Sequence, residues 1–518
     1  MVSKNPTSKV SQQRFYSFIT SHKTIGVFFL CAITIAAYHS SLNNLFLVNW
    51  DDYKYVVKNP DIRGFSLDHI RTVFSKYYVG NYAPLQIISY MLDYTFWGMN
   101  PAGFIGFNVA LHLMNGMLFF LVVDRISANC RLAFLSALGF LLHPVQVESV
   151  VWISQRKTVL AMFFFLVALL SYVCYRENRT RHGYAYYIVS LLAFLCALLS
   201  KSVTVILPLV LVLYDLCIVS PENRRKLLLN KIPFGAAAVA IAALALKSQA
   251  YEAGGGIVPD YLGDTPFSTF FTMLTVFMKY AGLLIWPSDL SIIYNPPIRT
   301  NIDWAVAMAG TFSVLFCFGL FYLYRRNKQV FFWASLAPIG LLPVSQMVPL
   351  TTIMNDRYLY FPLIGCAVVF AQGALYCTGM IPRLGEWRGV ALVCLALSPL
   401  PVLTWQRTLV WHDSLTLWTD AYQKSQDYIT AAGRGNALAQ EGRFDEALEM
   451  YDKSLSMEPT CEEALRGVGA IYLNRGDYDR AIEYLQRYVS NYPESDLAKK
   501  MLGLAYSQRK KRQENISP

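Results

Sequence analysis

Residues 101–123 read PAGFIGFNVALHLMNGMLFFLVV and contain no charged side chain. A membrane-spanning helix needs about 20 consecutive apolar residues, so this stretch predicts one crossing. Of the 518 residues in the chain, 55% are hydrophobic and only 15% are charged, whereas soluble domains carry about 25% charged residues. This composition excludes a disordered chain, a coiled coil and a single soluble enzyme. It predicts an all-α, polytopic membrane protein with a soluble part attached.

Ten more apolar runs resemble the first one, so we predict about eleven membrane spans. A further apolar stretch, 269–286, we interpret as a partly buried or re-entrant helix that does not cross. The predicted spans cover about 24–40, 101–123, 132–147, 158–175, 184–200, 203–219, 232–246, 302–323, 330–346, 359–380 and 389–404.

Lysine and arginine gather in alternate short loops between these runs, which predicts the orientation of the chain by the positive-inside rule. The N-terminus is then cytoplasmic, and the tail after residue 404 lies in the bacterial periplasm or the ER lumen. The net charge of +11 is assigned to these loops, so we expect no nucleic-acid partner. We predict a bacterial inner-membrane protein, with the ER membrane as the alternative.

The polar tail repeats itself every 34 residues, as shown by Gly435, Gly469 and Gly503 and by Pro459 and Pro493. This period is that of tetratricopeptide repeats, which are stacked helix hairpins. We predict two full repeats, 426–459 and 460–493, between a degenerate helix at 411–425 and a last helix from about 494. The predicted domains are therefore 1–404, in the membrane, and 405–518, outside it.

The first long outer loop, about 41–100, begins with WDDYKYVVKNPD. A carboxylate at a membrane surface can act as a general base, which makes Asp51 and Asp52 candidate catalytic residues. The other interpretation is a solvated turn. Two amphipathic stretches follow, 66–78 and 84–97, whose apolar residues recur at helical spacing. We expect both helices to lie at the membrane surface.

Three more polar clusters interrupt the chain where we predict outer helix ends. Cations at such ends bind a lipid phosphate or snorkel to the interface, and both interpretations stay open. Asp356 either pairs with Arg357 or leaves Arg357 to face the same cavity as Lys201. The candidate phosphate-binding residues are Arg156, Lys157, Lys201 and Arg357, and the candidate site-shaping residues are His143, Glu148 and Tyr358.

Several ordered motifs resemble those of the transmembrane and tetratricopeptide repeat containing O-mannosyltransferases and their bacterial relatives. They are WDDYKYVVKNPD, PLQIISYMLDYTFWGMNPAGFIGFNVALHLMN, LHPVQVESVVWISQRKTVLA, LLSKSVTVILP and NDRYLYFPLIG, followed by the repeats. The HP-x-x-x-E element is kept as His143, Pro144 and Glu148. Two features depart from the eukaryotic pattern: Lys201 is followed by Ser and Val rather than Glu and Gln, and the array is shorter. These departures favour a bacterial enzyme.

The resemblance implies a GT-C glycosyltransferase that takes a sugar from a polyprenyl-phosphate carrier and transfers it, with inversion, to a hydroxyl group. It also implies that the catalytic carboxylate lies in the first outer loop, in an acidic pair that here is Asp51 and Asp52. We assign Asp51 as base and Asp52 as a positioning group, with the reverse order as the alternative. The expected acceptor is an exported protein, recruited by the repeats. A lipid or polysaccharide acceptor, and a non-enzymatic scaffold that presents the repeats, are the alternatives. We expect no cofactor; a divalent ion at the aspartates would need a third ligand, which the sequence does not show.

Overall fold

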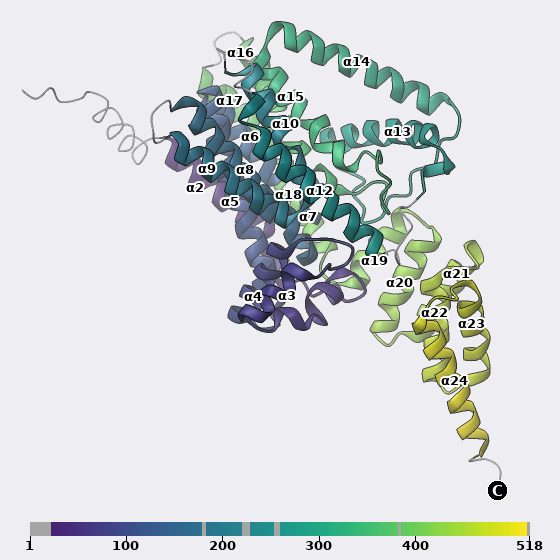
Figure 1. Ribbon diagram of the computed structural model, residues 1–518. Coiled ribbons are helices and arrows are strands. Elements are labelled where there is room, and N and C mark those ends of the chain that lie inside the picture. Colours follow the sequence, from purple (N-terminus) through teal and green to yellow (C-terminus); the bar gives the residue numbers. More distant parts are fainter. Residues whose placement is uncertain (1–21, 179–182, 220–227, 253–259, 382–384, 515–518) are drawn as a thin grey trace, which may run out of the picture. The chain divides into compact units, whose positions relative to one another are not determined.

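The computed structural model describes residues 22–178, 183–219, 228–252, 260–381 and 385–514 (Figure 1). Every regular element in these residues is a helix, apart from one isolated bridge between Tyr78 and Asn81. The all-helical fold class is therefore confirmed. The described residues form two compact units: 22–46, 54–290 and 296–409 in the first, and 47–53, 291–295 and 410–514 in the second. Two short segments that precede residue 404 thus group with the tail.

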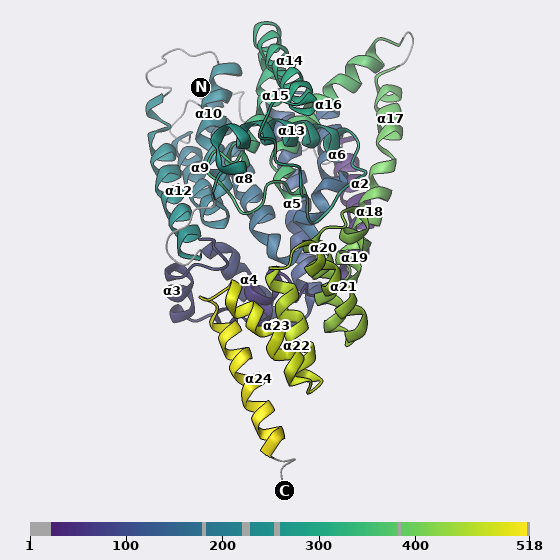
Figure 2. The ribbon, with the colours of Figure 1, turned by 90° about the vertical axis from the view of Figure 1, so that its right-hand side faces the viewer.

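The first unit is a bundle of helices joined by short helical turns (Figures 1 and 2). Its longer helices are α2 (His22–Tyr38), α3 (Leu67–Ser75), α4 (Pro84–Trp97), α5 (Pro101–Ser127), α6 (Cys130–Leu142), α7 (Val147–Val151), α8 (Arg156–Glu177), α9 (Gly183–Ser200), α10 (Leu207–Cys217), α12 (Ile232–Glu252), α13 (Pro266–Ile285), α14 (Trp304–Arg326), α15 (Lys328–Leu341), α16 (Pro362–Gly379), α17 (Glu386–Leu397) and α18 (Pro399–Val410). Its short turns are η1 (His39–Asn43), η2 (Tyr53–Val57), η3 (Pro60–Ile62), η4 (Pro144–Gln146), η5 (Ile153–Gln155), η6 (Ser202–Ile206), η7 (Leu262–Asp264), η8 (Leu342–Val344) and η9 (Asp356–Leu359).

Nine helices in the described residues are long and apolar enough to cross a membrane, and the pair α6 and η4–α7, bent by 54°, makes a tenth if counted as one span. This differs from the eleven predicted spans in two ways. The runs 203–219 and 330–346 fall on the shorter apolar helices Ser202–Cys217 and Lys328–Val344. Helix α13, which we predicted not to cross, is among the nine.

Asparagine and aspartate side chains determine where several of these helices begin. Asn100, Asn129 and Asp303 accept N–H groups in the first turns of α5, α6 and α14 at 3.1, 3.1 and 2.9 Å. Such caps satisfy backbone donors that have no partner inside the helix, and each typically contributes about 1 kcal/mol. The spans therefore start at polar residues that also mark the limits of the apolar runs.

One end of the first unit collects the basic loops that we predicted to lie inside. Arg125, near the end of α5, pairs with Glu177, at the end of α8, at 2.6 Å. Gln329, at the start of α15, donates to the carbonyl oxygen of Ile126 at 3.2 Å. These contacts place the last residues of α5 and α8 beside the first turn of α15, as alternating crossings require.

Asp215, for which the sequence suggested no role, lies fully buried at this basic end. Its carboxylate pairs with Arg176 at 3.0 Å, accepts the hydroxyl of Tyr172 at 2.6 Å and also pairs with Lys231. A buried carboxylate without such partners would be strongly destabilising. The network is therefore structural, and it ties α8 and α10 to the start of α12.

The opposite end of the unit is built from short turns. Turn η4 and helix α7 contact η9, and η6 contacts η8. Thr404, on α18, donates to the carbonyl oxygen of Leu142, at the end of α6, at 2.7 Å. The polar clusters around residues 143–157, 200–202 and 355–358 therefore meet at one end of the bundle, which agrees with their predicted placement on one side.

Helix α13 ends at this same polar end. Helix α12 reaches that end, where Ser248 donates to the carbonyl oxygen of Gly80 at 3.0 Å. Helix α14 finishes at the basic end, immediately before Gln329. Close to the end of α13, the carbonyl oxygen of Leu284 accepts a hydrogen bond from His143 at 3.1 Å. That 269–286 is a partly buried or re-entrant helix stays a prediction.

The second unit contains the helices predicted from the 34-residue period. Helices α20 and α21 form one antiparallel hairpin and α22 and α23 the next, with α19 packed before them and α24 after them. Their bounds are α19 (Ser414–Lys424), α20 (Tyr428–Gln440), α21 (Phe444–Met457), α22 (Glu462–Asn474), α23 (Tyr478–Asn491) and α24 (Asp496–Glu514).

The ring of Tyr451 shows why glycine recurs in these hairpins. A Cβ atom built at Gly435 would lie 2.7 Å from the ring, and one built at Gly467 would lie 2.3 Å from it. The ring, which is 1% exposed, is thus enclosed between a glycine of its own hairpin and a glycine of the next. A methyl group on either side would force the aromatic ring to move.

We predict that Gly435→Ala lowers the stability of the repeats by about 1–3 kcal/mol, because it overpacks a rigid ring. The matched control is Gly503→Ala. Gly503 lies two repeat periods after Gly435, and a Cβ atom built there would meet nothing within 4 Å. That change should raise helix stability by about 0.5–1 kcal/mol. Hydrogen exchange of α20–α24 in the full-length protein measures both. Equal stabilisation by the two changes would contradict the packing argument.

Candidate functional site

The polar end of the first unit is shaped by a bend after α6. His143 interrupts the helix, and its Nδ1 accepts the N–H of Val145 at 3.3 Å. Its Nε2 therefore carries the hydrogen that is donated to the carbonyl oxygen of Leu284 at 3.1 Å. Both ring nitrogens are used within the fold, and the ring is buried. His143 thus holds the bend against α13, and its role is structural.

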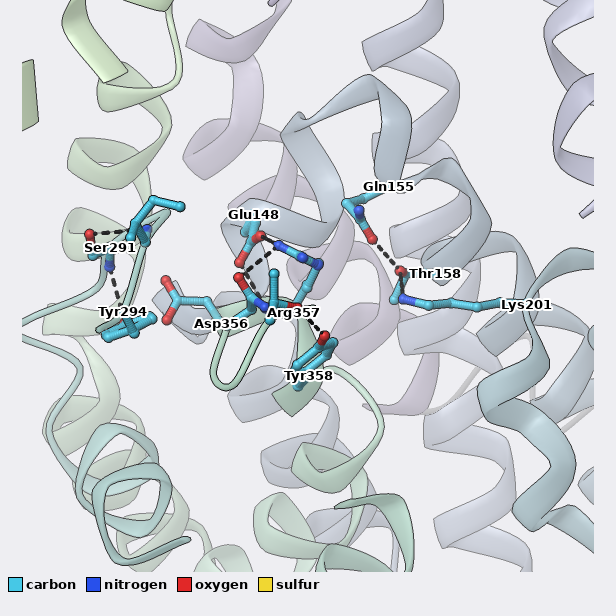
Figure 3. Close-up of polar contacts among 12 residues, drawn as sticks. Glu148, Gln155, Thr158, Lys201, Ser291, Tyr294, Asp356, Arg357 and Tyr358 are labelled. Atoms are coloured by element: carbon cyan, nitrogen blue, oxygen red, sulfur yellow. Dashed lines mark hydrogen bonds and ion pairs between the residues drawn. The ribbon is translucent and has the colours of Figure 1, made fainter. Parts of the chain in front are cut away.

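Glu148, on α7, holds Arg357 in place (Figure 3). Its carboxylate accepts the backbone N–H of Arg357 at 2.9 Å and the guanidinium at 2.5 Å. The guanidinium also donates to Asn355 at 3.0 Å and lies over the rings of Trp152 and Tyr358 at 5.5 and 5.4 Å. Such charge-assisted and cation–π contacts fix both the position and the plane of an arginine.

Asp356 is the neighbour of Arg357 in η9, and its side chain points away from the Arg357 guanidinium (Figure 3). Its carboxylate faces Arg407, on α18, at 3.9 Å, and both side chains are buried. The backbone turn of η9 directs the two neighbouring side chains to different partners. A local pair of Asp356 with Arg357, and a site shared by Arg357 and Lys201, both stay predictions.

Lys201, at the start of η6, lies close enough to Arg357 and Lys157 for their charges to act on it. Its Nζ donates to Thr158 at 2.8 Å, and Thr158 donates to Gln155 at 2.8 Å (Figure 3). Burial lowers the pKa of the Lys201 ammonium well below its usual range; the charges of Lys157 and Arg357 lower it further, and Glu148 raises it. Three cations therefore meet in one electrostatic environment, which an anion would stabilise.

Lys157 is the most enclosed of these three cations, with a relative exposure of 6%. Its Nζ donates to the hydroxyl of Tyr55 at 3.2 Å and lies 5.0 Å from the centre of that ring. Tyr55 was not among the residues that the sequence singled out, although it lies in the motif WDDYKYVVKNPD. A tyrosine three residues after an acidic pair carries no signal of such a contact.

Arg156 is used within the fold, and we leave it out of the phosphate site. Its side chain is fully buried, and its guanidinium pairs with Asp93 at 2.6 Å. The same guanidinium donates to the carbonyl oxygen of Phe104 at 2.7 Å, to Ser89 at 3.3 Å and to Asn108. Our prediction that Arg156 binds a donor phosphate therefore has no support in the geometry.

Sequence reasoning missed Asp93 because it grouped the apolar residues of α4 and not the polar ones. Gln86, Tyr90 and Asp93 follow each other at spacings of four and three and are all buried, whereas Leu92 is 39% exposed. A polar stripe at helical spacing was the available signal. The buried face of α4 carries this stripe because Arg156 needs an anionic partner.

Asp51 and Asp52 belong to the second unit, whereas the cations belong to the first. Asp52 is buried, and its carboxylate accepts the N–H of Leu47 at 3.0 Å. Asp51 is half-buried. Next to them, the ring of Trp50 lies 4.9 Å from that of Trp418 on α19. The acidic pair is thus carried by a segment that packs on the first helix of the tail.

The described residues contain no group of three or more His, Cys, Asp or Glu side chains that could hold a metal ion. The expectation that the reaction needs no cofactor stays a prediction, and no step below involves a metal.

Comparisons with known proteins confirm the resemblance seen in the motifs. The tetratricopeptide repeat family model matches residues 433–496. Protein O-mannosyl-transferase TMTC3 of Mus musculus is 24% identical over 498 residues, which cover 86% of this chain and 52% of that protein. Protein O-mannosyl-transferase TMTC1 of Homo sapiens is 24% identical over 502 residues, covering 85% and 56%. The chain therefore spans about half the length of the curated relatives it matches.

Two solved structures are also similar to this chain. The oligosaccharyltransferase of Archaeoglobus fulgidus, tethered with an acceptor peptide, is 12% identical, with a TM-score of 0.43 over 83% of this chain and 59% of that one. ArnT of Cupriavidus metallidurans, bound to undecaprenyl phosphate, is 14% identical, with a TM-score of 0.40 over 88% and 80%.

We predict that Arg156→Lys destabilises the first unit by about 1–3 kcal/mol, because a lysine keeps the charge beside Asp93 but leaves other buried acceptors of the guanidinium without a hydrogen bond. Thermal unfolding of the full-length protein in detergent measures the loss. The matched control is Arg71→Lys on the exposed helix α3, whose pair with Asp68 lies in solvent and should matter little. A melting temperature for Arg156→Lys equal to that of the control would show that these buried hydrogen bonds are dispensable.

Proposed function

We propose that this chain is an inverting glycosyltransferase that moves a sugar from a polyprenyl-phosphate carrier to a hydroxyl group of an exported protein. The observation that carries the proposal is the meeting of Lys157, Lys201 and Arg357 at one end of a membrane helix bundle. The similarity to protein O-mannosyl-transferases over 85–86% of the chain supports sugar transfer as the reaction. A cluster of cations at a helix end suits the phosphate of a lipid-linked donor.

In the proposed step the acceptor oxygen attacks the anomeric carbon of the sugar from the side opposite the phosphate. The bond between that carbon and the phosphate oxygen breaks, and the new glycosidic bond forms. The carrier phosphate leaves with the bonding electrons, so its negative charge grows. Cations that are already in place stabilise this growing charge without reorganisation, which is how such sites lower the barrier.

Asp51 is the proposed base, which takes the proton of the acceptor hydroxyl. Its half-buried side chain suits proton exchange with an incoming group better than Asp52, whose carboxylate is buried and accepts the N–H of Leu47. We assign Asp52 to positioning the turn that carries Asp51.

The remaining site residues hold the cations in position. Glu148 fixes Arg357, Tyr358 packs against its guanidinium, and His143 holds the bend that presents α7. The fixed geometry matters because a displacement of about 1 Å can cost a hundredfold in rate.

We place the protein in the bacterial inner membrane, with the ER membrane as the alternative. The basic end faces the cytoplasm, as does the N-terminus, and the polar end faces the periplasm with the repeats. The repeats, in this proposal, recruit or orient the acceptor protein.

We predict that Asp51→Asn abolishes transfer, because an amide cannot accept the proton at neutral pH. Intact-mass analysis of exported proteins compares the wild type, a deletion strain and the deletion strain complemented with Asp51→Asn, and a further strain complemented with Asp52→Asn tests the second carboxylate. A mass difference of one sugar, present only in the wild type, supports the proposal and identifies sugar and acceptor together. An added sugar restored by Asp51→Asn but not by Asp52→Asn would exchange the two roles.

Two other outcomes of this experiment would change the function itself. If no exported protein gains mass, the lipid and polysaccharide fractions become the acceptors to examine. If both aspartate variants keep full transfer activity, the proposed base mechanism is wrong.

We predict that Lys201→Met lowers transfer about a hundredfold or more, the usual effect of removing one charge-stabilising group, without lowering stability. The matched control is Lys328→Met, which removes an exposed lysine at the start of α15, at the basic end of the unit. Because burial lowers the pKa of Lys201, its charge is lost as the pH rises through that lowered value. Transfer should fall there, and Lys201→Arg should move the fall to higher pH. Equal rates for Lys201→Met and Lys328→Met would remove Lys201 from the site.

A further inference from the structure

The loop between α2 and α5 contains a backbone conformation that side chains other than glycine rarely adopt. Val79 has φ +47° and Gly80 has φ +65°. Tyr78 and Asn81 exchange both backbone hydrogen bonds at 3.0 Å, which closes a two-residue turn around them. Positive φ at a β-branched residue is a true outlier. Such strain persists only where the surroundings impose it, and it is most common at functional sites.

Contacts from several elements impose this turn. The hydroxyl of Tyr78 donates to Asp61 at 2.8 Å, and Lys76 pairs with the same carboxylate at 2.9 Å. From α12, Ser248 donates to the carbonyl oxygen of Gly80 at 3.0 Å. Residues of η3, α12 and the chain before the turn therefore hold it from different directions.

The turn holds the side chain of Tyr55 in place. The hydroxyl of Tyr55 donates to the carbonyl oxygen of Tyr78 at 3.1 Å and accepts from the side chain of Asn81 at 3.2 Å. The ring is fully buried in an apolar cluster with Val73 and Met91 among others. The same hydroxyl receives the Nζ of Lys157 at 3.2 Å. The strained turn is thus connected to a cation of the proposed site through a single oxygen atom.

We propose that Tyr55 is a positioning residue, which the turn Tyr78–Asn81 holds so that its hydroxyl fixes the Lys157 ammonium for the carrier phosphate. This inference rests on the proposed function. The hydroxyl donates its hydrogen to the turn, so its lone pairs point to Lys157 and Asn81. A lysine side chain is flexible, and its ammonium gains most from a fixed acceptor when it must meet an anion at one place.

The test is a double-mutant cycle on binding of a polyprenyl monophosphate to the full-length protein in nanodiscs. Tyr55→Phe keeps the buried ring and removes only the oxygen. We expect it to weaken binding about five- to tenfold, as for one lost charge-assisted hydrogen bond, and Lys157→Met to weaken it more. In the Lys157→Met background, Tyr55→Phe should have no further effect, because the group it positions is gone.

The matched control is Tyr82→Phe in the same loop, whose hydroxyl donates to the carbonyl oxygen of Phe74 at 3.2 Å and not to Lys157. It should bind like the wild type. Asn81→Ala, which removes the second contact to the Tyr55 hydroxyl, should weaken binding in the same direction as Tyr55→Phe and serves if Tyr55→Phe does not fold.

The outcomes separate this inference from the proposed function. Loss of binding in Lys157→Met with wild-type binding in Tyr55→Phe and Asn81→Ala would overturn the role of Tyr55 and leave the phosphate site standing. An equal loss from Tyr55→Phe with and without Lys157 would show a merely structural tyrosine. Wild-type binding in both Lys157→Met and Lys201→Met would overturn the phosphate site and this inference with it.

Discussion

A lipid bilayer offers no hydrogen-bond partners, so every backbone group inside it must be satisfied within a helix. This constraint governs the first unit. Apolar helices fill the interior, and irregular backbone is confined to their ends, where η4, η5, η6 and η9 lie. The polar side chains that could do chemistry are carried by these short turns or by helix residues directly next to them. The location of the candidate site is therefore a consequence of where regular helices have to stop.

Two neighbouring cations, Arg156 and Lys157, show that adjacent side chains can have different partners in this fold. Successive residues on a helix point about 100° apart, so Arg156 meets Asp93 on α4 while Lys157 meets Tyr55. The sequence shows the two charges side by side and cannot distinguish them. The distinction depends on which element packs on each face, and those elements come from 63 and 102 residues earlier in the chain.

Local sequence patterns predicted most of the fold. Uninterrupted apolar runs predicted the long helices, and the 34-residue period predicted the hairpins, because both are properties of neighbouring residues. We predicted eleven spans, whereas nine or ten are long and apolar enough in the described residues, since η6–α10 and α15–η8 are shorter helices. The candidate site was predicted in part: the clusters were found, but their pairings were not. Glu148 and Arg357 are 209 residues apart, and no periodicity connects them.

The segment 47–53 has a consequence for the modularity of the chain. It precedes nearly all of the membrane helices, yet it packs with the tail, where Trp418 lies between Trp50 and the backbone of Gly433. Repeat arrays are usually exchangeable parts, because each repeat contacts only its neighbours. Here α19, the first helix of the array, also packs against the residues around Asp51 and Asp52. Among relatives, α19 and residues 47–53 should therefore be inherited together, and a chimera that exchanges only the tail would bring a foreign surface to the acidic pair.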